Sequence, residues 1–186
     1  MVTITSLWLA VLLSAIIVWV ASFIIWTVLP HHKNDYRGLP DEDAALAALR
    51  GQDLAPGQYD FPHLASRSDM KNPEVVEKFT QGPAGFLTVV PRGVPSMGKP
   101  MVLSLVYFIL VSICVAYLAG RILPAGTEYL TVFRVTGTTA WLAYGAAVVS
   151  DAIWFGRPWP SVIKTLADAL IYGMLTAGVF GWLWPA

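Results

Sequence analysis

Four long apolar runs and one polar segment make up most of the chain. The apolar runs cover residues 6–29, 101–120, 129–150 and 161–184, and the polar segment lies between the first two. A helix of about 20 residues crosses the hydrocarbon core of a bilayer, because each residue advances the helix by about 1.5 Å. The pattern therefore predicts an all-α membrane protein with four transmembrane helices.

The polar segment, residues 31–100, carries eight Lys and Arg and nine Asp and Glu, which is ordinary soluble composition. Acidic residues at 41–43 open one short helix, and the Asn-Pro pair at 72–73 opens another. Residues 86–90 favour a strand, with residues 54–62 as an extended partner. We expect a small α+β insert between helices 1 and 2. It can form little core of its own, so we expect it to pack against the membrane helices or a partner.

The chain thus divides into a first transmembrane helix, the soluble insert and a three-helix transmembrane bundle, at residues 1–30, 31–100 and 101–186. No cleavage signal clearly follows the first apolar run, so we expect that run to stay as an anchor. The composition also favours a membrane protein. Only 13% of residues are charged and the mean hydropathy is +0.60, whereas soluble domains carry about 25% charged residues.

The distribution of Lys and Arg predicts the orientation, because basic side chains near helix ends stay on the cytoplasmic side. One side of the predicted membrane carries Lys33, Arg37, Arg50, Arg92, Lys99, Arg157 and Lys164. The other side carries Arg121, and Arg134 if its side chain reaches the surface. We therefore expect residues 31–100 and 151–162 in the cytoplasm and both termini outside, with a bacterial inner membrane as the default location.

Charged side chains within the third and fourth runs are the first candidate site. They form a predicted intramembrane or interfacial cluster of Asp151, Arg157, Lys164, Asp168 and Arg134. Ionisable residues inside membrane helices are costly and often functional. Two interpretations remain open: a set of ion pairs that clamps the connection between helices 3 and 4, or a cytoplasmic vestibule for an ion, a proton or a small anion. In the second, Asp168 would be the deepest carboxylate.

Small residues at helical spacing predict where the helices pack closely. One stripe on the fourth helix and a shorter one on the second let another backbone approach; they consist of Ala169, Gly173, Ala177, Gly181 and of Ser112, Ala116, Gly120. By helical phase, Lys164 and Asp168 face away from the first stripe and need a second neighbour or water. We expect helices 2 to 4 to form a tight bundle with helix 1 at its edge.

Catalytic and metal-binding patterns are weak. The single cysteine, Cys114, lies in an apolar run, and the GxxxxGK match at residues 93–99 is followed by Pro100 where a phosphate loop needs Ser or Thr. The histidines, His31, His32 and His63, are weak metal candidates, because adjacent histidines on a regular element point apart. The sequence therefore predicts no enzyme, no metal site and no cofactor.

These observations favour a non-enzymatic integral membrane protein, either an accessory or assembly subunit of a membrane complex or a small homo-oligomer. The alternative is a small-solute or ion transporter that uses the charged cluster at the cytoplasmic ends of helices 3 and 4. Metal handling through the three histidines is the third hypothesis. Expected partners are the lipid bilayer and another protein or a second copy. Nucleic acid is not expected, because Lys and Arg equal Asp and Glu at 12 each and form no basic patch.

Overall fold

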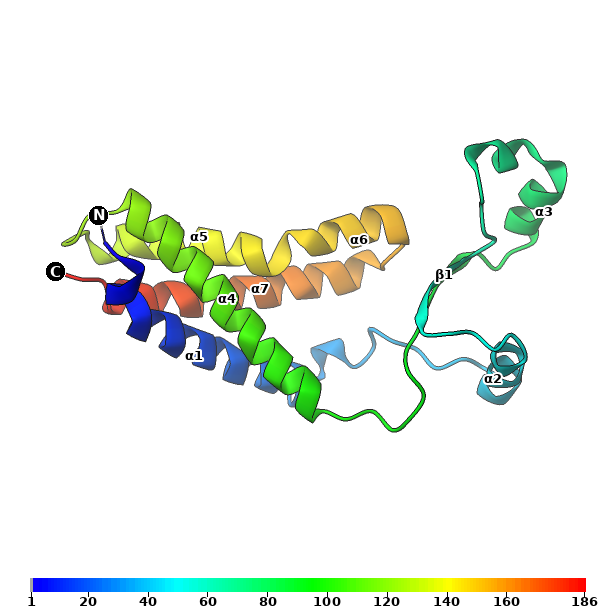
Figure 1. Ribbon diagram of the computed structural model, residues 1–186, viewed down its shortest axis with the longest axis horizontal. Helices are drawn as coiled ribbons and strands as arrows, with labels where there is room; N and C mark the ends of the chain where they lie inside the picture. Colours follow the sequence, from blue (N-terminus) through cyan, green and yellow to red (C-terminus); the bar gives the residue numbers. More distant parts are fainter. Residues whose placement is uncertain (1) are drawn as a thin grey trace. The chain divides into compact units, whose positions relative to one another are not determined.

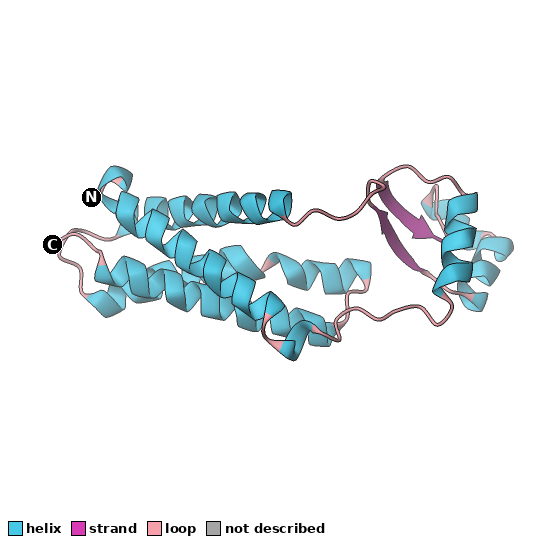
Figure 2. Ribbon diagram, turned by 90° about the horizontal axis from the view of Figure 1, so that it is seen from below, coloured by secondary structure: helices cyan, strands magenta, loops and turns pink. Residues whose placement is uncertain are grey.

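A computed structural model describes residues 2–186. The chain is mostly helical and contains one two-stranded antiparallel sheet (Figures 1 and 2). It divides into two compact units. We call them the helical bundle, formed by the residues up to Asp35 and by Ser96–Ala186, and the small unit, formed by Tyr36–Pro95.

The helical bundle contains five helices, α1 (Trp8–Thr27), α4 (Gly98–Ile122), α5 (Tyr129–Gly145), α6 (Ala147–Phe155) and α7 (Trp159–Trp182). A 3₁₀ turn, Ile4–Leu7, precedes α1, and a second, Pro30–His32, follows it. The most extensive helix pairing joins α5 to α7. The expectation that helix 1 lies at the edge is wrong, because α1 packs against both α4 and α7.

Among the described residues, three helical segments are long and apolar enough to cross a membrane: Ile4–Thr27, Gly98–Ile122 and Trp159–Trp182. Their mean hydropathies are 2.6, 2.5 and 1.4. These segments indicate an integral membrane protein. The predicted total of four spans is not confirmed, because the third apolar run is divided between α5, of 17 residues, and α6.

The division between α5 and α6 lies beside a close contact between α5 and α7. A Cβ atom on Gly145 would lie 2.8 Å from the Cβ of Ala169. The Ala146 N–H still donates to the carbonyl of Leu142, but the Val149 N–H donates to Ala146, three residues back. This exchange of an i−4 for an i−3 partner tightens the backbone and ends the regular helix.

The stripe of small residues on α7 lies against α5. A Cβ on Gly137 would lie 3.0 Å from the Cβ of Ala177, and one on Gly173 would lie 3.0 Å from the carbonyl oxygen of Gly137. Further along, a Cβ on Gly181 would lie 2.7 Å from the ring of Tyr129. Side chains larger than hydrogen at these glycines would force the two helices apart.

The second stripe, on α4, faces α1 and the N-terminal residues. Ser112 is buried and accepts a hydrogen bond from Ser14 at 3.1 Å, and Ala116 is fully buried. A Cβ on Gly120 would lie 2.6 Å from the carbonyl oxygen of Val2. Helix α4 is therefore held to α1 through its small residues.

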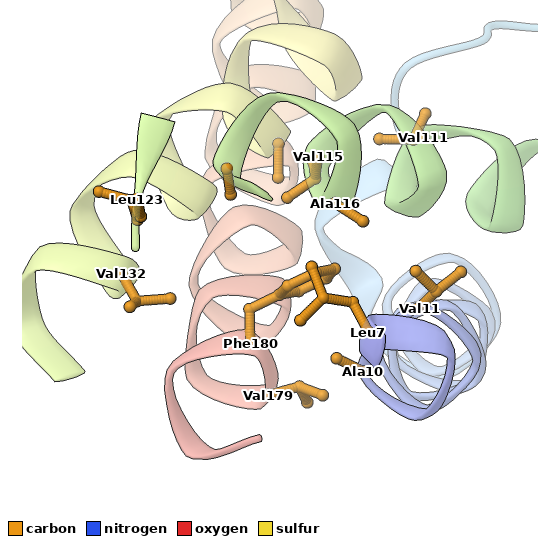
Figure 3. Close-up of a cluster of buried hydrophobic side chains, with 12 residues drawn as sticks. Leu7, Ala10, Val11, Val111, Val115, Ala116, Leu123, Val132, Val179 and Phe180 are labelled. Carbon is orange, nitrogen blue, oxygen red and sulfur yellow. The ribbon is translucent and has the colours of Figure 1, made fainter. Parts of the chain in front are cut away.

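The main core lies where α1, α4, α5 and α7 meet. Phe180 of α7 is fully buried and lies among side chains of α1 and α4 (Figure 3). The cluster consists of Leu7, Ala10, Val11, Val111, Val115, Ala116, Ala119, Leu123, Val132, Ala140, Val179 and Phe180. It fixes the helices on which the candidate site is built.

The small unit contains α2 (Glu42–Gly51), β1 (Gly57–Phe61), a 3₁₀ turn (Arg67–Lys71), α3 (Pro73–Gln81) and β2 (Gly85–Val89). Asp41 caps α2 by accepting from the Ala44 N–H, and Asn72 caps α3 by accepting from the Glu74 N–H. Strands β1 and β2 pair antiparallel, with Tyr59 opposite Leu87.

Candidate functional site

The best-defined polar site of the bundle lies where the chain leaves α1 and contacts the first turns of α7. The helix ends at Thr27, and the 3₁₀ turn Pro30–His32 follows. Pro30 stands at the first position of that turn, where a missing N–H costs nothing. The turn directs two adjacent histidine rings towards α7.

Asp168 of α7 accepts hydrogen bonds from both histidines. His31 Nε2 lies 3.1 Å from Asp168 Oδ1, and His32 Nε2 lies 2.6 Å from Asp168 Oδ2. Asp168 is only 3% exposed. A buried carboxylate is costly unless it is paired and hydrogen-bonded, so these two rings stabilise its position within the apolar helix.

Asp35 forms the other side of the site. It lies 2.6 Å from His32 Nδ1, accepts from Lys164 Nζ at 2.6 Å and accepts from Ser161 Oγ at 3.2 Å. The hydrogen bond from His32, followed by that from Lys164, lowers the pKa of the Asp35 carboxyl from 3.8 to about 2. Asp35 is therefore a carboxylate throughout the physiological range.

His32 lies between two carboxylates and under an aromatic ring. Nδ1 of His32 contacts Asp35 and Nε2 contacts Asp168, so each ring nitrogen has a carboxylate partner. The ring of Trp26 stacks on His32 with centroids 3.9 Å apart and planes 3° apart. The stack and the two hydrogen bonds together fix the position and the orientation of the imidazole. We call His31, His32, Asp35, Lys164 and Asp168 the His–Asp cluster.

The structure places the predicted charged residues in three separate settings. Lys164 and Asp168 belong to the His–Asp cluster, as described above. Asp151 and Arg157 form a looser pair at 3.8 Å, and Arg157 also donates to Thr165 at 3.2 Å. Arg134 is exposed and lines a shallow pocket of about 220 Å³ between α5 and α7.

Of the three histidines, two belong to the bundle site and one to the small unit. His63 lies 2.7 Å from Asp60, and both side chains are exposed. That pair has the same chemistry as His32 with Asp35 but is open to water. It is therefore a matched control for experiments on the cluster.

Sequence reasoning missed the convergence of His31, His32 and Asp35 on α7. The expectation that adjacent histidines point apart holds for a regular helix or strand. Here the rings extend from a single 3₁₀ turn, with centroids 4.1 Å apart, and each contacts a different oxygen of Asp168. The signal available in the sequence was the density of titratable residues at 31–35, directly after a span.

The small unit offers a different kind of surface. Of residues 36–95, all of which the structure describes, none is buried. Helix α2 exposes Leu46 and Leu49, and α3 exposes Val76 and Phe79. Two amphipathic helices therefore present apolar side chains that the unit itself does not cover.

The chain matches no protein-family model, and no curated protein and no solved structure is similar to it.

Proposed function

We propose that the chain is a non-enzymatic integral membrane protein that serves as an accessory or assembly subunit and binds a protein partner through its small unit. The observation that carries this proposal is the lack of any buried residue among positions 36–95. Sixty ordered residues with exposed Leu, Val and Phe leave apolar surface in water. Covering that surface is favourable by about 25 cal/mol per Å².

Charge favours a protein over a lipid surface as the occupant. Residues 36–95 carry six Lys and Arg against eight Asp and Glu. An acidic segment is repelled by the anionic lipids and nucleic acids that attract basic ones. The partner we propose is a folded protein whose contact surface is apolar at its centre and basic at its rim.

The proposed topology has four spans, with α5 and α6 together crossing the membrane as the third. Their apolar run, residues 129–150, is 22 residues long in sequence despite the break at Ala146. The excess of Lys and Arg supports a cytoplasmic small unit and external termini, and we propose the bacterial inner membrane as the location.

Cysteine accessibility tests the topology. Ser68→Cys should react only from the cytoplasmic side and Thr127→Cys only from the outside.

The accessory role is tested by native mass spectrometry of the protein extracted from its own membrane in mild detergent. We expect a second polypeptide at fixed stoichiometry. The double variant Val76→Ser/Phe79→Ser should release it, whereas the control Glu77→Gln/Lys78→Gln, on the same helix, should keep it. A monomer, a homo-oligomer, or a partner retained by the Ser variant would overturn the proposal.

Ion transport is the second candidate, and one observation favours it: Asp168 is a buried carboxylate within a helix long and apolar enough to span a membrane. Such residues often lie on ion pathways. In reconstituted vesicles, Asp168→Asn should abolish ion flux while the protein stays folded. If the wild type shows no ion flux and Asp168→Asn only lowers the thermal stability, the cluster is a structural clamp and not an ion pathway.

A further inference from the structure

We infer that His31, His32 and Asp168 form a binding site for a divalent transition-metal ion, with Zn²⁺ as the reference ion. The inference goes beyond the proposed accessory role and does not depend on it. Ligand atoms of the three residues all lie within 4.8 Å of one another. Two imidazoles and one carboxylate are donors that suit zinc and neighbouring divalent ions and are poorly matched to magnesium or calcium.

The distances require only small side-chain movements to accept the ion. Zinc binds imidazole nitrogen and carboxylate oxygen at about 2.0–2.2 Å, which places tetrahedral ligands roughly 3.3–3.5 Å from each other. His31 Nε2 and His32 Nε2 lie 3.1 and 2.6 Å from the oxygens of Asp168. The ion would take the place of the hydrogen bonds that now join the two rings to Asp168.

The surroundings of His32 are a second, independent observation. A metal-bound histidine almost always donates its other ring N–H to a carboxylate or carbonyl, which fixes the tautomer and the ring orientation. His32 Nδ1 does so to Asp35 at 2.6 Å. Asp35 is held in turn by Lys164 and Ser161. This series of hydrogen bonds turns Nε2 of His32 towards Asp168, where it can bind the metal ion.

Two of the three proposed ligands are buried, and the third is open to water. The side chains of His32 and Asp168 are each about 5% exposed, whereas that of His31 is 34% exposed. An ion reaches the site from water past His31. Three protein ligands leave a fourth tetrahedral position for water or for a group supplied by a partner.

The experiment uses the full chain in detergent, stripped with a chelator and then titrated with Zn²⁺ in competition with a chromophoric chelator. We expect one Zn²⁺ per chain, and no binding of Mg²⁺ at the same concentration. His31→Ala should weaken Zn²⁺ binding at least tenfold, because it removes one ligand. His63→Ala, which removes the exposed histidine of the other His–Asp pair, should leave the affinity unchanged.

Two further variants keep the test decisive. Asp35→Asn should weaken Zn²⁺ binding by about 10–100-fold, because Asp35 positions His32 without touching the ion. Bound Co²⁺ should show the visible absorption of a four-coordinate site, lost in His31→Ala and kept in His63→Ala. Asp168→Asn is less informative, since it disturbs a buried pair. We expect His31→Ala to fold, because the His31 side chain is 34% exposed and Asp168 keeps its contact with His32.

Binding below one ion per chain, an affinity that His31→Ala leaves unchanged, or an equal loss in His63→Ala would each overturn the inference. The titration is done on the chain without any partner. Failure to bind Zn²⁺ therefore leaves the mass-spectrometric result untouched, and failure to find a partner leaves the metal titration untouched.

Discussion

The helical bundle and the small unit hold their apolar side chains differently. In the bundle, twelve residues from four helices and their flanking turns form one buried cluster (Figure 3). In the small unit, caps, turns and one strand pair give order, yet none of its described residues is buried. The bundle is specified by packing around a buried core, and the small unit by caps, turns and backbone pairing without one. Four measurements test this contrast.

The largest difference is expected for phenylalanine truncation. Phe180→Ala removes a fully buried ring in the bundle and should lower the free energy of unfolding by about 3 kcal/mol. This loss is at the low end of the range for a buried Phe. When the membrane helices separate, the exposed side chains still lie in an apolar medium, so less free energy is lost than in water. Phe79→Ala, in α3, should change it little. Thermal unfolding in detergent measures both, and equal effects would break the contrast.

A smaller loss is expected where glycines set the distance between helices. Gly173→Val places carbon atoms against the backbone of α5, because a Cβ at this position would lie 3.0 Å from the Gly137 carbonyl oxygen. Overpacking of this kind costs about 1–3 kcal/mol. Gly38→Val, in the small unit, meets nothing within 4 Å and should leave the melting temperature unchanged. A neutral Gly173→Val would show that α5 and α7 separate easily.

The buried hydroxyl pair between α1 and α4 should contribute less. Ser14 donates to Ser112 Oγ at 3.1 Å, and hydrogen bonds between membrane helices contribute about 0.6 kcal/mol on average. We expect Ser14→Ala to destabilise the bundle by about that amount. The comparison variant is Ser22→Ala, whose hydroxyl bonds only to its own helix at Trp19. If Ser22→Ala costs more, the interhelical bond is not what holds α4 to α1.

The smallest effect concerns local order in the small unit. Asp69 accepts from the backbone N–H and the hydroxyl of Ser66, each at 2.9 Å, and these bonds lower the pKa of its carboxyl below 3.8. The stability they contribute is present above the usual pKa and is lost as pH falls through the lowered value. NMR titration of labelled Asp should show the shift, and Ser66→Ala should reverse only part of it, because the backbone N–H, which is the larger cause, is kept. An unshifted Asp69 would mean that the turn is not formed.

The sequence was sufficient where a local pattern determines the structure. Three of the four apolar runs are helices long enough to span a membrane, and the short helices begin at the acidic and Asn-Pro signals. The sequence did not predict the end of α5 at Gly145, where the structure brings Ala169 of α7 into close contact. No window along the chain contains both partners of that contact.

The sequence also predicted only part of the candidate site. Lys164 and Asp168 were visible as charges in an apolar helix. Their partners were not, since Asp35, His31 and His32 lie more than 120 residues earlier in the chain. Which charge meets which depends on the packing of α1 against α7. The sequence therefore predicted the charges of α7 and left their partners unassigned.

The distance in sequence between His32 and Asp168 has a consequence in time. The two residues are 136 positions apart, and a ribosome adds about 5–20 residues per second. His32 is therefore synthesised roughly ten seconds before the carboxylate it contacts. During that interval α1 is complete while α7 does not exist. The cluster can therefore close only after the first turns of α7 have been made, so His32 waits for Asp168 while every helix between α1 and α7 is synthesised.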